Sequence, residues 1–328
     1  MWLKLPVCPR VRKSIRTLRA KKKKAINLIL FGGLGNQLFQ YFAGQYLAHK
    51  ADAVLKVDST FSQFGRSGHS DWVGEITLPG YISPSAPRFS LRYLGPLLKR
   101  RFRDFLGHVI RTKEMKLKIL HQYHSSAPGY DPQLEQLKPP VTIVGYFQTW
   151  RYFQALREKD LVPEIGMKNP SRWLLDMTDQ MRSQGNVLGI HVRRGDYVGN
   201  AGIGTLSVSY YEAAATELTS RGAKWDAVLI FSDDTTLVEH EFKGFLGGKE
   251  NLVFVKPPLE SHAFESLILL SRSSFILIAN STFSWWAATL GNPKQAIACP
   301  SKWFAQMEDP QDLYPPSWIR VPSDWVSH

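Results

Sequence analysis

The stretch NVLGIHVRRGDYVG, residues Asn186–Gly199, changes character halfway along. Its first half is apolar apart from Asn186 and His191 and predicts a short buried strand. Its second half places Arg193, Arg194 and Asp196 around a glycine. Because burying an arginine without a partner is costly, two arginines at the end of a buried strand indicate either a structural ion pair or a site for an anion.

The residues after this stretch alternate between apolar strands and amphipathic helices. Five strands interleaved with helices predict a doubly wound α/β domain, which we expect to span residues 166–328. Residues 159–186, with their prolines and glycines, are typical of a passage between domains. The expected strands are 186–192, 227–231, 251–255, 275–279 and 295–299, and the expected helices are 209–220, 262–272, 280–291 and a short one after 232–234.

The residues before it predict a second domain of the same kind, spanning residues 25–165. AINLILF (25–31) and AVLKVD (53–58) are predicted strands, separated by the turn GGLGNQ and a helix to residue 50. This strand–helix–strand unit implies a parallel sheet. A further strand is expected at 141–147 and a helix in 148–160, whereas residues 60–140 carry no firm assignment.

In open parallel sheets, ligands bind beyond the carboxyl ends of the strands. Polar groups follow four of the expected strands directly, so we expect their side chains to face one crevice. These groups are Gly32–Asn36, His191–Asp196, Ser232–Asp234 and Asn280–Ser284.

The last of these groups, Asn280–Ser284, stands at the start of a predicted helix. Its hydroxyls and free backbone N–H groups either cap the helix or form an anion site. Guanidinium groups bind phosphate through two parallel hydrogen bonds. Together with Arg193 or Arg194, this helix start therefore predicts a diphosphate site, the alternative being that Arg193 pairs only with Asp196.

The acidic group and the glycine loop leave several interpretations open. Asp233 and Asp234 are candidate metal ligands, helix caps, or carboxylates that recognise the N–H edge of a base. His191, taken alone, is typical of a hydrogen-bonded core histidine. The GGLGNQ loop is neither a dinucleotide fingerprint nor a P-loop, and its Asn36 and Gln37 either bind a ligand or cap the helix.

The net charge of +13 over 328 residues is unevenly distributed. Residues 1–24 hold ten lysines or arginines and no acid, and residues 88–118 hold ten more. The remainder is slightly acidic, which favours a local anionic partner. We expect the 1–24 tail to be either solvated or a membrane tether, and 88–118 to lie on a bilayer or pack on the first domain.

Two cysteines, Cys8 and Cys299, cannot form a disulfide framework and favour a reducing compartment. No apolar run approaches the roughly 18–20 residues of a membrane span, and the N-terminus lacks the apolar core of a signal peptide. We therefore expect a cytoplasmic protein that is soluble or peripheral at the inner face of the membrane.

Five motifs taken together resemble the α-1,2-fucosyltransferases of glycosyltransferase family 11, of the bacterial type. They are FGGLGNQLFQYFAG, GYFQTWRYF, IHVRRGDYV, IFSDD and IANSTFSWWAATLG, in that order between residues 26 and 300. The resemblance implies a GT-B fold, with two Rossmann-like doubly wound domains facing a central cleft. It also implies GDP-L-fucose as donor, an inverting reaction, no metal, and a glycan or lipid-linked oligosaccharide as acceptor.

The resemblance also suggests a role for each candidate residue. It implies that Arg193 holds the β-phosphate and that His191 and Asp234, or Asp233, lie on the guanine side. Asp196 either acts as a base or orients Arg193 or Arg194. The remaining donor-site candidates are Asn280, Ser281, Thr282, Phe283 and Ser284, and the acceptor-side loop candidates are Gly33, Gly35, Asn36 and Gln37.

Two competing functions fit the sequence less well. One is a transferase of the same fold that uses another nucleotide sugar. The other is a nucleic-acid-binding protein, suggested by the two basic segments. Because those segments lie outside the α/β core and no nucleic-acid motif accompanies them, we expect no nucleic-acid partner.

Overall fold

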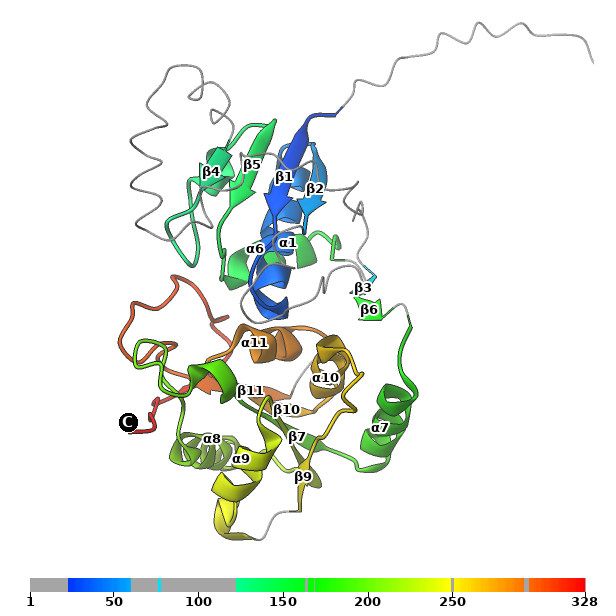
Figure 1. Cartoon of the computed structure of the whole chain (residues 1–328), viewed down its shortest axis with the longest axis vertical. Helices are drawn as coiled ribbons and strands as arrows, with labels where there is room; N and C mark the ends of the chain where they lie inside the picture. The colour runs from blue at the N-terminus through cyan, green and yellow to red at the C-terminus, as the bar shows by residue number, and fades with distance from the viewer. Residues whose placement is uncertain are drawn as a thin grey trace, which may run out of the picture.

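The computed structural model describes residues 23–59, 76–77, 122–162, 165–167, 169–248, 251–291 and 295–327. These residues form two α/β halves stacked end to end, each built on a parallel sheet (Figure 1). The strand order is β2-β1-β5-β4 in the first sheet and β12-β11-β10-β7-β8-β9 in the second. The predicted fold, two Rossmann-like α/β domains in the GT-B arrangement, is confirmed.

The first half confirms the predicted parallel strand–helix–strand unit. β1 lies between β2 and β5, with Ile26 opposite Leu55 on one side and Val141 on the other. Its elements are β1 (Ala25–Ile29), α1 (Leu34–Lys50), β2 (Val54–Asp58), β4 (Gln122–His124), η3 (Leu134–Gln136), β5 (Val141–Val144) and α6 (Trp150–Arg157).

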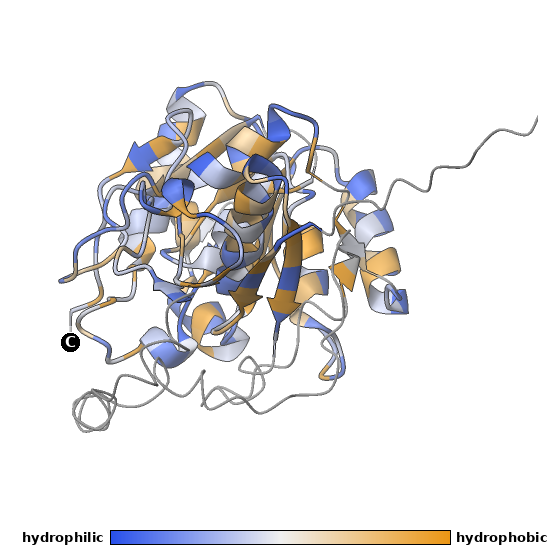
Figure 2. Cartoon of the chain, turned by 90° about the horizontal axis from the view of Figure 1, so that it is seen from above, coloured by the Kyte–Doolittle hydropathy of each residue, from blue (hydrophilic) through white to orange (hydrophobic). Residues whose placement is uncertain are grey.

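The second half is centred on the strand predicted from the opening stretch, whose six residues are all buried. Figure 2, which views the molecule from above, shows strands that are mostly orange, and therefore apolar, among helices and loops that carry blue hydrophilic segments. The strands are β7 (Val187–Val192), β8 (Ala227–Ser232), β9 (Leu252–Phe254), β10 (Phe275–Leu277), β11 (Ala296–Pro300) and β12 (Ile319–Val321). The helices are α7 (Arg172–Ser183), η4 (Gly195–Tyr197), α8 (Val208–Ser220), α9 (Thr235–Glu241), η5 (Phe245–Gly248), α10 (Ala263–Leu270) and α11 (Thr282–Thr289).

β12 and α7 are among the elements of the second half that were not expected. β12 adds a strand beyond 295–299, in parallel with β11, and its three residues are too few to show an apolar period. α7 lies within 159–186, where prolines and a glycine suggested a linker. Its start is fixed by Ser171, whose side chain accepts a hydrogen bond from the Leu174 amide at 3.2 Å.

The two halves pack closely against each other through α1 and α11. Trp286 Nε1 donates a hydrogen bond to the Gly35 carbonyl at 2.8 Å. The Trp286 ring stacks on Phe42 with centroids 5.0 Å apart and contacts Phe153 edge to face. The larger hydrophobic cluster contains buried residues of both sheets. This packing fixes the start of α1 next to the start of α11.

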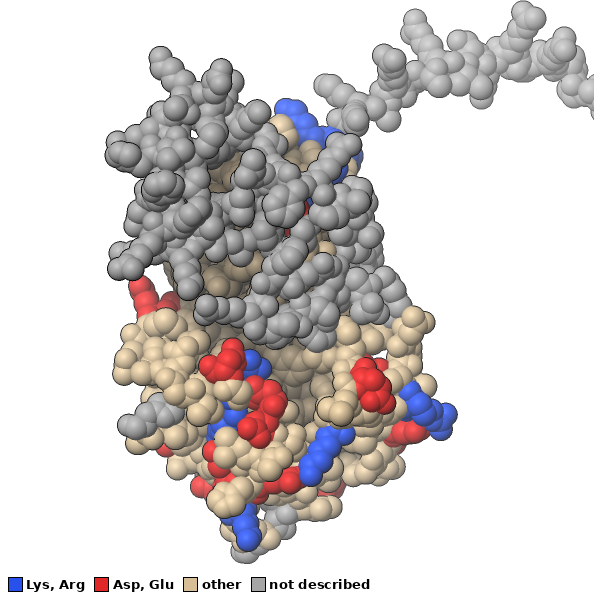
Figure 3. Space-filling view, in the orientation of Figure 1, with Lys and Arg blue, Asp and Glu red and all other residues tan. Residues whose placement is uncertain are grey.

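A short antiparallel pair joins β3 (Ile76–Thr77) to β6 (Gly166–Met167). Residues 1–22 of the predicted tail 1–24, and the predicted segment 88–118, lie outside the described residues. The boundaries 25–165 and 166–328 stay predictions. No helix among the described residues has the length and apolar character needed to cross a bilayer. On the face seen in Figure 3, acidic and basic side chains are interspersed over the second half.

Candidate active site

A cavity of about 490 Å³ lies between the two halves, at the carboxyl ends of β7 and β8 and the starts of α1 and α11. All four polar groups predicted from the sequence contribute to it, as the strand-end rule requires. The predicted residues that line it are Gly33, Gly35, Asn36, His191, Arg193, Asp196, Asp233, Ser281, Thr282 and Phe283.

Arg193 is the cation of this cavity, and two carboxylates hold it in place. Its Nη1 lies 3.1 Å from Asp233 Oδ2, and its Nη2 pairs with Asp196 Oδ1. The guanidinium also lies over the ring of Tyr197, 5.0 Å from its centroid. Burial disfavours the charged form of Arg193, but the negative charges of Asp233 and Asp196 have the larger effect. The pKa of Arg193 is therefore raised. Arg193 therefore presents a fixed positive charge.

Arg194 turns the other way, so of the two arginines it is Arg193 that pairs with Asp196. Its side chain is 1% exposed, and its Nη2 and Nε lie 2.7 and 2.8 Å from Glu241 Oε2. Nη1 donates to the Arg193 carbonyl at 2.9 Å, and its backbone N–H donates to Asp233 at 2.8 Å. Consecutive residues at a strand end point to opposite sides, so Arg194 supports the cavity from behind and does not line it.

The two neighbouring aspartates also differ in their contacts. Asp233 lines the cavity and accepts from both Arg193 and the Arg194 amide. Asp234 does not line it and caps α9, its Oδ1 accepting from the Leu237 amide at 3.0 Å. Of the interpretations of this pair, helix capping therefore holds for Asp234, and only Asp233 is placed to meet a ligand.

His191 lies in the cavity wall and is 4% exposed. Its ring stacks on Phe283 with centroids 5.1 Å apart, and its buried Nδ1 has no hydrogen-bond partner among the described residues. Burial, followed by the charge of Arg193, lowers the pKa of His191 to about 3. The ring is therefore neutral at ordinary pH, and its Nδ1 is the kind of orphaned polar atom that a ligand or water satisfies.

The start of α11 is open toward the cavity. Ser281 occupies the N-cap position without a side-chain capping hydrogen bond, and Thr282 and Phe283 follow in the cavity wall. The other two candidate donor-site residues of this group, Asn280 and Ser284, do not line the cavity. Ser284 donates to the Ser281 carbonyl at 3.1 Å, and Asn280 donates to the Gly204 carbonyl at 3.1 Å. Both lie outside the cavity lining, because these side chains bond to backbone carbonyls within the fold.

The start of α1 meets the cavity from the other half. Gly33 is its N-cap, with no side-chain cap and no acidic residue in the first turn. Asn36 lines the cavity, with its Oδ1 accepting from Gln148 Nε2 at 2.9 Å. Gln37 is fully buried, outside the lining, and donates to the Gly32 carbonyl at 2.8 Å. Two uncapped helix N-termini thus converge beside Arg193, which favours an anion.

Several lining residues were missed. The segment after β9 contributes Pro257, Pro258, Leu259 and Ser261, and Leu259 is fully exposed at the rim. This segment follows a predicted strand, so the strand-end rule could have found it. It was overlooked because, apart from Ser261, these lining residues are apolar.

Metal binding finds little support in the cavity residues. Within the described ranges, no cluster of three or more His, Cys, Asp or Glu side chains has a metal-binding arrangement. The two carboxylates that line the cavity, Asp196 and Asp233, both pair with Arg193. A donor set already neutralised by a guanidinium is a poor fit for a divalent cation.

Comparisons with known proteins agree with this geometry. The family profile "Glycosyl transferase family 11" matches residues 118–322. The chain is 26% identical over 302 residues to an α-1,2-colitosyltransferase of Escherichia coli, covering 89% of this chain and 97% of that protein. It is 25% identical to the O-antigen biosynthesis glycosyltransferase WbnK of Escherichia coli, covering 89% and 99%.

A more distant relative is galactoside α-(1,2)-fucosyltransferase 1 of Oryctolagus cuniculus, 22% identical over 70% of this chain and 63% of that one. Among solved structures, the α-1,6-fucosyltransferase NodZ soaked with GDP-fucose aligns with a TM-score of 0.48 and 13% identity, covering 82% of this chain and 93% of that chain. The profile match covers more than half of the sequence. The protein is a glycosyltransferase, and it belongs to glycosyl transferase family 11.

Proposed function

We propose that this protein transfers L-fucose from GDP-L-fucose to a hydroxyl group, O2 of a galactoside, on a glycan or lipid-linked oligosaccharide. The observation that carries the proposal is the meeting of Arg193 with two uncapped helix starts in one cavity. The names of the relatives, an α-1,2-colitosyltransferase and galactoside α-1,2-fucosyltransferases, support the sugar class and the linkage.

The arrangement suits a reaction in which a diphosphate leaves. Glycosyl transfer passes through an oxocarbenium-like state while negative charge develops on the leaving group. Arg193, held by Asp196 and Asp233, is already in place to stabilise that charge, together with the backbone N–H groups at the starts of α1 and α11. In this proposal no metal is required, so transfer should persist in excess EDTA.

The nucleoside end of the donor is assigned to His191 and Asp233. The neutral His191 ring has an unpartnered Nδ1, and a carboxylate such as Asp233 retains acceptor positions beyond those used by Arg193 and the Arg194 amide. In this proposal, Asp196 holds the Arg193 side chain in its orientation. Because its carboxylate is paired with that cation, attack by the acceptor hydroxyl from the opposite face, with inversion, proceeds in this proposal with little help from it.

The experiment that tests the proposal is a donor panel. The purified protein is incubated with GDP-L-fucose and other nucleotide sugars, with galactose-ended acceptors, and nucleotide release and product linkage are measured. We expect release with GDP-L-fucose and an α-1,2 linkage in the product. Turnover with a different nucleotide sugar and none with GDP-L-fucose would reject the donor assignment.

Transfer of colitose is a second candidate, favoured by the relative that carries that name. Colitose is the 3-deoxy form of L-fucose, so the two donors differ by one hydroxyl group. A site that hydrogen-bonds this hydroxyl rejects the deoxy sugar strongly, whereas an apolar site barely distinguishes the two. Competition between the two GDP-linked sugars in one reaction therefore decides between them.

We also propose that the protein acts in the cytoplasm and binds the inner membrane surface peripherally through residues 1–24 or 88–118. The support is the basic composition of these segments, because each basic residue near an anionic leaflet contributes about 1 kcal/mol. Co-sedimentation with anionic vesicles at low and high salt, with and without residues 1–24, tests this assignment. Absence of binding at low salt would exclude it.

A further inference from the structure

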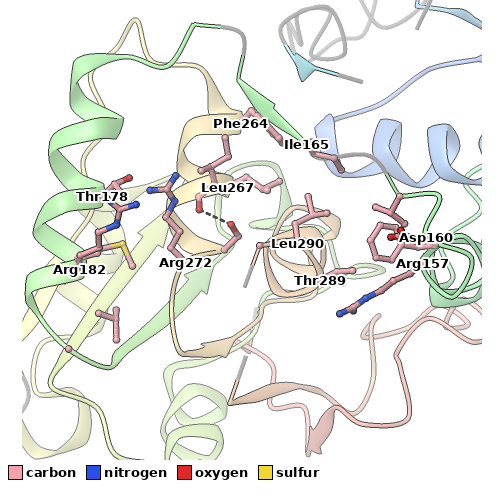
Figure 4. A pocket seen from close by; sticks show the side chains of 18 residues that line it. Arg157, Asp160, Ile165, Thr178, Arg182, Phe264, Leu267, Arg272, Thr289 and Leu290 are labelled. Atoms are coloured by element: carbon pink, nitrogen blue, oxygen red, sulfur yellow. Dashed lines mark hydrogen bonds between the residues drawn. The ribbon is translucent and has the colours of Figure 1, made fainter. Parts of the chain in front are cut away.

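A second cavity, of about 750 Å³, lies on the other side of helices α10 and α11 (Figure 4). Ala263 and Ser266 of α10 line the candidate active site, whereas Leu267 and Ile268 line this rear cavity. The first turn of α11 faces the candidate active site, and its end, from Thr289, faces the rear cavity. The two cavities are therefore separate, and the function proposed above uses no residue of the second.

The walls of the rear cavity come from both halves and combine polar and apolar surface in similar proportion. α6 and the loop after it contribute one side, and α7, α10 and the end of α11 contribute the other. The main apolar lining residues are Val162, Ile165, Met181, Val187, Phe264 and Leu267. Such a surface is suited to the hydrocarbon part of a ligand.

Three arginines, Arg157, Arg182 and Arg272, also line this cavity. In the described ranges, neither Arg157 nor Arg272 lies within ion-pair distance of a carboxylate, and Arg182 pairs only with Asp179, at 3.2 Å. In Figure 4, Arg272 reaches across to Arg182. Burial, and next the charge of Arg182, lowers the pKa of Arg272. Asp179 opposes both effects, so the two guanidinium groups share one neighbouring carboxylate and one positive charge stays uncompensated.

A buried polar atom accompanies these arginines. Thr178 is 4% exposed, and its buried Oγ1 has no hydrogen-bond partner among the described residues. Figure 4 shows Thr178 beside the guanidinium groups of Arg182 and Arg272. A hydroxyl donor next to two guanidinium groups is a set that phosphate oxygens satisfy.

We propose that the rear cavity binds a phosphate ester with an apolar substituent. The phosphate lies between Arg182 and Arg272, within reach of Thr178, and the apolar substituent lies against Met181 and Leu267. Guanidinium groups match phosphate geometry, and an anion here relieves the repulsion between the two arginines. Inorganic phosphate carries the same charged group without the apolar substituent. The test therefore compares binding of a phosphate ester with binding of inorganic phosphate.

The test is calorimetric titration of the full chain with monooctyl phosphate, inorganic phosphate and octyl glucoside. It is performed in an Arg193→Ala background, so that phosphate binding at the candidate active site does not contribute. We expect one site for monooctyl phosphate. The double change Arg182→Ala and Arg272→Ala should weaken its binding at least tenfold.

The matched control is Arg172→Ala. Arg172 is also an exposed arginine of α7 in an intrahelical ion pair, with Asp176 at 3.0 Å, but it lies outside the cavity. Its replacement should leave the affinity unchanged. Arg272→Gln provides a second variant that removes the charge but keeps a polar side chain, and thermal melts of all variants verify folding.

Three outcomes would overturn the proposal. They are absence of binding, equal affinity in the double variant, and equal binding of uncharged octyl glucoside. Equal affinity for inorganic phosphate and monooctyl phosphate would overturn the proposed contact between the cavity and the apolar substituent. None of these measurements uses the sugar donor, so failure here is distinct from failure of the proposed transferase reaction.

Discussion

At the residue scale, Arg193 and Arg194 are adjacent in sequence and differ in environment. Arg193 is 24% exposed and faces the cavity, whereas Arg194 is 1% exposed and faces Glu241. Breaking a buried ion pair leaves an uncompensated charge, so Arg194 stabilises the loop that carries Arg193. Of the two arginines, Arg193 makes the proposed diphosphate contact.

Arg193→Lys should reduce transfer at least tenfold, which corresponds to about 1.4 kcal/mol in the transition state. Lysine keeps the charge but cannot bind two phosphate oxygens in a fixed fork. The measurement is kcat/KM with GDP-L-fucose. Arg221→Lys is the control, because Arg221 is an exposed arginine paired with Glu217 and lies outside both cavities. Near wild-type activity of the Arg193 variant would reject the assignment.

The low pKa of His191, about 3, predicts a pH dependence of stability. Below the unfolded-state pKa of about 6.5, the unfolded chain binds a proton that the folded chain refuses, so stability falls as the pH drops from about 6.5 toward 3. Between pH 7 and pH 5, wild type should lose about 1 to 2 kcal/mol more than His191→Gln. Urea unfolding of both proteins at the two pH values measures this difference. Equal losses would show that His191 is not the group responsible.

At the element scale, the start of α1 is held against the start of α11. A Cβ at Gly35 would lie 2.4 Å from the backbone carbon of Thr282, closer than real contacts allow. The same glycine carbonyl accepts the hydrogen bond from Trp286. The glycine-rich loop is therefore required for close packing of two helices, in addition to any contact with a ligand.

Gly35→Ala should destabilise the protein by about 1 to 3 kcal/mol, because backbone must shift to admit the methyl group. The shift also moves the two helix starts apart, so transfer activity should fall with it. Gly166→Ala is the control, since a Cβ there meets nothing within 4 Å. Thermal melts and transfer assays of both variants measure the effect, and a fully stable, active Gly35 variant would contradict the contact.

At the scale of the whole molecule, the two sheets share a hydrophobic cluster. It contains Phe42 and Phe153 from the first half and Trp285 and Trp286 from the second, all buried. Interdomain surfaces are commonly small and polar, which permits domain motion. The aromatic packing in this protein favours a fixed relation between the halves, with the candidate active site on one side of it and the rear cavity on the other.

This shared cluster predicts one cooperative thermal transition. Scanning calorimetry should give a single peak with equal calorimetric and van't Hoff enthalpies. Trp286→Ala removes the ring at the centre of the cluster and should cost about 3 to 5 kcal/mol. Two separate peaks for the wild-type protein would show that the halves unfold independently.

The sequence by itself determined the α/β class, the parallel sheets and the polar groups at the strand ends. These follow from short-range apolar periods and from the rule that parallel strands end at one edge, as the stretch around His191 illustrates. It did not reveal β12 or α7, because three residues carry no period and helix α7 follows a proline-rich passage.

Only the tertiary structure decided which of two adjacent, chemically equal residues faces the cavity. Arg193 and Arg194 differ because Glu241 lies behind the strand, and Asp233 and Asp234 differ because the helix α9 begins at the second. Which of two neighbouring residues faces the cavity depends on contacts with residues distant in the sequence, such as Glu241, 47 residues beyond Arg194. It also depends on where a helix begins. The rear cavity was equally invisible in the sequence, since its arginines come from three different segments, one in the first half and two in the second.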